Sequence, residues 1–125
     1  MKYLACLLAA VLPTCAPATA QTFTRNNSAP TATSSFTAPS SYVSGINVTT
    51  GGTAGYVLIY DAANVPADGT VAPARCLPLA ANTGIEINWR AWPIWFRVGV
   101  VVVFSTTGCF TQTSSSTAFI AVDTR

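Results

Sequence analysis

The sequence contains no histidine, and only 8% of its 125 residues are charged. Histidine is the usual general base for serine and cysteine nucleophiles and a common metal ligand, so its absence argues against most acyl-transfer and zinc enzymes. Six lysine and arginine residues against four acidic residues give a net charge of +2. Such a small charge excludes a strongly basic nucleic-acid-binding protein and an acidic disordered tail. The length allows one small domain.

Residues 1–20 have the features of a secretory signal peptide. Lys2 precedes an apolar run over residues 3–12, and an Ala-Thr-Ala motif ends at Ala20. The run is too short to span a bilayer, so we expect cleavage after Ala20, export to the periplasm, the medium or a cell or virion surface, and no membrane span. The alternative is a lipid anchor, because the Leu-Pro-Thr-Cys motif ending at Cys15 loosely resembles a bacterial lipobox.

Two of the four cysteines leave with this leader, so the exported chain keeps Cys76 and Cys109. Thiols oxidise outside the cytoplasm, and we therefore expect these two residues to form a disulfide. The alternative is two separately buried thiols. Closing a loop of roughly 33 residues stabilises a fold by about 3 to 4 kcal/mol in the chain-entropy model.

Residues 21–41 are rich in Thr, Ser, Ala and Pro, with Phe23 and Phe36 as the only large apolar residues before Tyr42. Such a segment buries too little apolar surface to order itself, so we expect a disordered arm or linker. The alternative is that Phe23 or Phe36 docks the arm onto a neighbouring molecule as an added strand.

From residue 42 onward, short β-type runs alternate with Gly, Asn, Asp and Pro clusters, and no helical period appears. This predicts an all-β domain over 42–125: a small antiparallel β-sandwich, immunoglobulin-like in a loose sense only, or a small barrel. The run at 100–104 indicates a strand buried on both faces. The expected strands are 42–49, 55–61, 75–80, 85–90, 94–105, 109–113 and 117–123, with a short strand near Val71.

Several motifs resemble those of small uncharacterised β-rich proteins found in phage and prophage-bearing bacterial genomes. They include residues 55–61, residues 82–85 and, above all, the FSTTGCFT sequence of residues 104–111. The resemblance covers most of the expected domain and implies a virion or surface structural component, without an activity to carry over. The signal peptide and the tryptophans of residues 89–95 depart from the family, and the former argues against an internal capsid role.

The acidic residues offer the one remaining route to catalysis. A carboxylate pair drawn from Asp61, Asp68, Glu86 and Asp123 would suit glycoside hydrolysis, but a domain of this size has little room for the cleft. Asp61 and Asp68 have the context of turn residues. We therefore expect no enzyme, no cofactor and no metal. Glu86 is expected to face solvent or to pair with one of three arginines, Arg75, Arg90 or Arg97.

The tryptophan segment is the one place where a positive function is indicated. Trp89 is expected to fill the core, whereas Trp92 and Trp95 are open between packing and an interaction surface. We expect a secreted structural, assembly or surface-display domain that contacts copies of itself or a surface or virion protein. The alternative is a carbohydrate-binding module that uses Trp92 and Trp95. The candidate interaction residues are Trp92, Trp95, Arg90, Phe23 and Phe36.

Overall fold

The computed structural model describes residues 24–27 and 35–125, so the predicted signal peptide, Cys15 and Phe23 lie outside the described residues. The described chain is all-β and antiparallel, as predicted. Within these residues there is no helix long and apolar enough to cross a membrane. The strands are β1 (Thr24–Asn27), β2 (Ser35–Thr50), β3 (Gly55–Asp61), β4 (Gly69–Thr70), β5 (Arg75–Leu79), β6 (Gly84–Asn88), β7 (Ile94–Ser105), β8 (Thr111–Gln112) and β9 (Ala118–Thr124).

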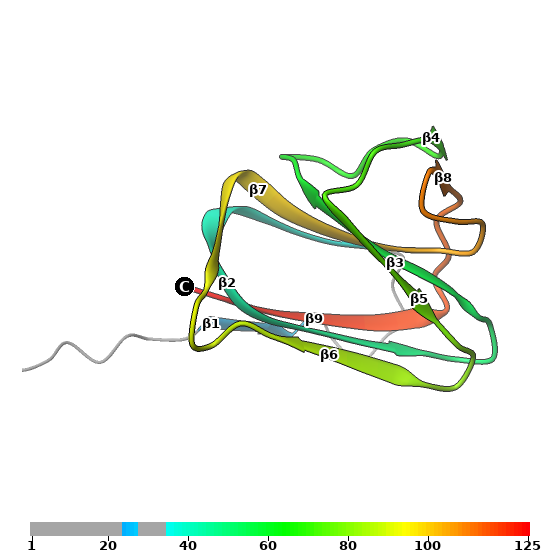
Figure 1. The fold of residues 1–125 in the computed structure, drawn as a ribbon, viewed down its shortest axis with the longest axis horizontal. Helices are drawn as coiled ribbons and strands as arrows, with labels where there is room; N and C mark the ends of the chain where they lie inside the picture. The colour runs from blue at the N-terminus through cyan, green and yellow to red at the C-terminus, as the bar shows by residue number, and fades with distance from the viewer. Residues whose placement is uncertain (1–23, 28–34) are drawn as a thin grey trace, which may run out of the picture.

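A seven-stranded sheet curls over on itself, in the order β1-β9-β2-β7-β3-β5, with β6 also paired to β2. The long strand β2 produces the curl, because its first half pairs with β7 and its second half pairs with β9 and β6. One layer therefore contains β5, β3, β7 and the first half of β2. The other layer contains β1, β9, the second half of β2 and β6 (Figure 1).

The bend in β2 lies at Ser44, where the pairing shifts on both edges of the strand. Val43 pairs with Ile94 of β7, whereas Gly45 pairs with Asn88 of β6. The strands β6 and β7 therefore follow one another along the same edge of β2, and residues 89–93 form a loop opposite Ser44. Ser44 is also the extra residue in the pairing with β9, and such bulges bend a strand. The loop of residues 89–93 therefore lies at the bend between the two layers.

The main core lies between the two layers. Alternate residues of β7 point into it, whereas Val101 and Val103 point to the opposite face and pack with Leu58 and Tyr60. The predicted burial of β7 on both faces is thus confirmed. The buried residues of the main core are Phe36, Val43, Ile46, Val48, Val57, Ile59, Leu79, Phe96, Val100, Val102, Phe104, Ala118, Ile120 and Val122.

The small sheet of β4 and β8, with its adjoining loops, adjoins this second apolar cluster (Figure 1). The Tyr60 hydroxyl donates a hydrogen bond of 2.8 Å to Oε1 of the fully buried Gln112. The Gln112 amide in turn donates to the Pro66 carbonyl at 2.8 Å. Burial raises the pKa of Tyr60, which keeps its hydroxyl protonated and able to donate. The buried Tyr60 hydroxyl and the buried Gln112 amide therefore both have hydrogen-bond partners.

The structure differs from the disordered arm predicted over residues 21–41. Residues 35–41 belong to β2 and pair with β7, and Thr24–Asn27 pairs with β9. Phe36 is 8% exposed and lies in the core, so it does not contribute to an exposed interaction surface. The prediction considered only what the segment buries by itself. A strand added to a buried neighbour needs few apolar residues, and here Phe36 and Ala38 supply them.

Candidate functional site

Three exposed aromatic residues lie at the bend, and we call Tyr42, Trp92 and Trp95 the aromatic corner. Tyr42 of β2 pairs directly with Trp95 of β7, and their ring centroids are 4.7 Å apart with the planes tilted by 46°. Each of these two residues is 47% exposed, and Trp92 in the adjoining loop is 86% exposed. The structure thus leaves Trp92 mostly in solvent and Trp95 about half exposed. Trp89 is partly buried and packs against the main core, so it lies at the margin of the core that it was expected to fill.

Backbone hydrogen bonds hold the tryptophan loop in place. The Trp89 N–H donates to the Ser44 carbonyl at 2.8 Å, and the Trp92 N–H donates to the Trp89 carbonyl at 3.0 Å. The Asn88 side chain accepts the Arg90 N–H at 3.0 Å. Trp89 packs inward, and the Arg75 guanidinium lies 5.9 Å from the centroid of its ring. Trp92 is therefore presented by an anchored turn.

Arg90 belongs to this loop and lies at the outer face of the layer that contains β9, the second half of β2 and β6. Its guanidinium lies 4.0 Å from the Asp123 carboxylate, and its side chain is 61% exposed. An exposed ion pair of this length stabilises the fold little. Among the side chains of residues 35–125, Glu86 has no arginine partner, so its predicted position in solvent is the one observed.

A groove crosses this outer face, and we call it the sheet-face groove. It has a volume of about 370 Å³. Its floor contains the small residues Gly45 and Ala121, and Asn47 lies between Glu86 and Ala121 on the neighbouring strands. The groove is lined by Gly45, Ile46, Asn47, Glu86, Asn88, Arg90, Phe119, Ala121 and Asp123.

Sequence reasoning missed this groove. The alternation in residues 85–90 placed Glu86, Asn88 and Arg90 on one face of a strand, which is the only available signal. It could not show that β2 brings Gly45 and Asn47 beside them, or that β9 forms the opposite wall. Those pairings join segments that are far apart in the chain.

Asp61 caps an irregularity in β7. Its carboxylate accepts the backbone N–H of Val98 at 2.8 Å and those of Arg97 and Gly99 at 3.3 Å each. These hydrogen bonds, the one from Val98 above all, hold the pKa of Asp61 below its ordinary value. The pairing shows why a cap is needed, since Arg97 and Val98 together lie opposite the single residue Ser40. Asp61 thus has a structural role.

Asp68 ties the loop before β4 to the chain after β8. Its carboxylate accepts the Ser114 hydroxyl at 2.7 Å, the Ser114 N–H at 3.0 Å and the Gln112 amide at 3.3 Å. The hydrogen bonds from Ser114 are the main reason that the pKa of Asp68 is lowered. Asp68 therefore also has a structural role, since it holds these two segments together.

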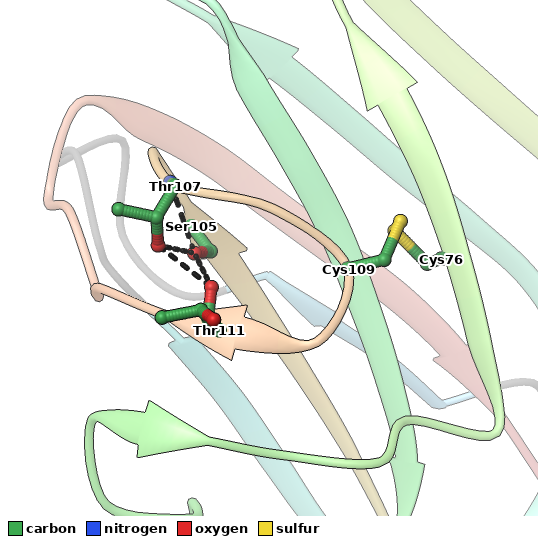
Figure 2. Close-up of a disulfide and its surroundings, with 5 residues drawn as sticks. All are labelled: Cys76, Ser105, Thr107, Cys109 and Thr111. Atoms are coloured by element: carbon green, nitrogen blue, oxygen red, sulfur yellow. Dashed lines mark hydrogen bonds between the residues drawn. A yellow bond between two sulfur atoms is a disulfide. The ribbon is translucent and has the colours of Figure 1, made fainter.

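Cys76 and Cys109 form the predicted disulfide, with Cα atoms 5.5 Å apart. The bond joins β5 to the loop between β7 and β8 (Figure 2). Hydroxyl groups fasten the base of the same loop: Thr107 donates to the Thr111 carbonyl at 2.6 Å, and Ser105 accepts the Thr113 N–H at 2.9 Å. Covalent and polar links together fix the loop against the sheet.

Neither a candidate metal site in the described residues nor a similarity to known proteins indicates the function. The part of the chain that the structure describes holds no group of three or more His, Cys, Asp or Glu side chains suited to a metal ion. Comparison with known proteins leaves the family open, since no family model, curated protein or solved structure matches the chain.

Proposed function

We propose that this protein is an exported, non-enzymatic structural domain for assembly or surface display, and that its aromatic corner contacts another protein, in the first place a second copy. The observation that carries the proposal is the exposure of Trp92 on an anchored turn, followed in the chain by Trp95 of β7, which contacts Tyr42 of β2. Tryptophan and tyrosine are enriched in the buried centres of protein interfaces. Exposed apolar groups that lie together mark such surfaces.

The chemistry of the chain supports a role without catalysis. The sequence has no histidine, and Cys76 and Cys109 are joined in a disulfide. Asp61 accepts hydrogen bonds from the irregular stretch of β7, and Asp68 accepts hydrogen bonds from Ser114 and Gln112; these hydrogen bonds lower both pKa values. A general acid would instead need a raised pKa. The resemblance to β-rich phage and prophage proteins favours a virion or cell-surface component.

A carbohydrate-binding module that uses the tryptophans is the second candidate. The exposure of Trp92, with Arg90 two residues away in the same loop, favours it, because a flat indole can stack on a sugar ring. The 46° tilt between Tyr42 and Trp95 favours the protein contact instead, since the two rings do not form one flat platform.

Sedimentation velocity of the exported chain over a wide concentration range tests the assembly proposal. The wild-type chain should self-associate, and a Trp92→Ala, Trp95→Ala double variant should associate at least about tenfold more weakly, which corresponds to about 1.4 kcal/mol.

Phe110→Ala is the matched control, because Phe110 is also an exposed aromatic residue but follows the C-terminal end of β7, whereas Trp95 lies near the start of this strand. It should associate like the wild type. A chain that stays monomeric at every concentration, or a double variant that associates like the wild type, contradicts self-assembly through the aromatic corner.

A further inference from the structure

The sheet-face groove is formed mainly by residues of paired β-strands. Three neighbouring strands, β9, β2 and β6, supply its lining together with Arg90 in the loop after β6, and the outward residues of the strands face one another across the pairings. Asn47 pairs with Glu86 on one side, and Gly45 pairs with Asn88 on that side and with Asp123 on the other. Side chains on paired strands have fixed separations, so the lining groups are held in place.

The depth of the groove depends on Gly45. A Cβ atom at this position would lie 3.2 Å from Oδ2 of Asp123 and 3.5 Å from the Ile87 carbonyl oxygen. A larger side chain would therefore project between the walls and fill the groove. Ala121 keeps the neighbouring part of the floor low. A volume of about 370 Å³ lies within the range of small-molecule sites.

The lining offers both hydrogen-bond donors and acceptors. The Asn47 and Asn88 amides do both, the carboxylates of Glu86 and Asp123 accept, and the Arg90 guanidinium donates. Phe119 adds an aromatic ring at the β9 wall. Hydroxyl groups on adjacent carbons of a sugar also donate and accept, so a saccharide matches this set of groups.

Charge narrows the ligand class further. The lining carries the acidic residues Glu86 and Asp123 and the basic residue Arg90. On the other side of β9, Arg25 of β1 pairs with Asp123, so charges of both signs meet at this face, which disfavours a strongly charged ligand of either sign. The polar lining does not suit an apolar ligand. We propose that the sheet-face groove binds a neutral saccharide, a site separate from the aromatic corner and independent of self-association.

Isothermal titration calorimetry of the exported chain tests this proposal with four neutral hexasaccharides, built from glucose, mannose, xylose and N-acetylglucosamine. At least one should bind with one site per chain. Asn47→Ala and Glu86→Ala should each weaken that binding about tenfold or more, because each removes a side chain that lines the groove. Both residues are exposed, and circular dichroism will show that the variants keep the fold.

Thr49→Ala is the matched control, because Thr49 is the next outward residue of β2 after Asn47 and does not line the groove. It should bind like the wild type, and so should the Trp92→Ala, Trp95→Ala double variant. Absence of binding by all four hexasaccharides overturns the proposal. Binding that is lost only in the tryptophan double variant also overturns it and assigns the sugar to the aromatic corner.

Discussion

At the scale of single residues, acidic side chains organise this fold by accepting backbone N–H groups. Asp61 lies at the end of β3 and serves three N–H groups of the irregular stretch in β7. Sequence context alone placed Asp61 in a turn, which is close to its role. The partners could not be inferred, because residues 97–99 are brought beside Asp61 only by the pairing of β3 with β7.

Replacing Asp61 with asparagine tests this role. The amide keeps one acceptor oxygen but loses the charge, so the hydrogen bonds to Val98 and its neighbours weaken. We expect Asp61→Asn to unfold at a lower urea concentration than the wild type. Glu86→Gln, at an exposed carboxylate without an arginine partner among the side chains of residues 35–125, should leave the midpoint unchanged. Equal losses in both variants would show only a general effect of charge.

The lowered pKa values of Asp61 and Asp68 also predict a dependence on pH. Their contribution to the free energy of unfolding is fully present above the unfolded pKa of about 3.9 and is lost as pH falls through the lower folded values. We expect the melting temperature to drop below about pH 4. Measured by circular dichroism, Asp61→Asn should show a shallower drop than the wild type, and an identical drop would contradict the assignment.

At the scale of elements, the strands with self-contained signals could be predicted. The bounds of β3 and β7 agree with those expected, because each is an apolar, β-branched run between turn residues. The first half of β2 could not be predicted, since its Ser, Thr and Pro composition gains a role only beside β7. The sheet-face groove was missed for the same reason, because it depends on non-local pairing.

Phe36→Ala tests the assignment of residues 35–41 to a strand of the core. Removing a buried phenyl ring leaves a cavity, so we expect a loss of about 3 kcal/mol in the free energy of unfolding, measured with urea. Thr37→Ala, at the adjacent exposed position of β2, should change it by less than about 0.5 kcal/mol. A negligible effect of Phe36→Ala would mean that this segment is not packed in solution.

At the scale of the whole molecule, the disulfide links one edge of the sheet to the loop beside the small second sheet. Its formation could be predicted from the two cysteines that follow the predicted signal peptide, whereas the loop that it fastens could not. A Cys76→Ser, Cys109→Ser double variant should lose about 3 to 4 kcal/mol in the free energy of unfolding. Urea unfolding with and without reductant provides the measurement, and the variant itself should be insensitive to reductant.

The passage of β2 through both layers makes them a single mechanical unit. Peeling one layer from the other would require tearing this shared ribbon away from β7 or from β9 and β6, so neither layer can act as an independent lobe. Thermal unfolding followed by circular dichroism should therefore show one cooperative transition, without a plateau from a partly unfolded intermediate. If the domain is displayed at a surface, as we propose, that all-or-none unfolding would deny proteases a partly opened target.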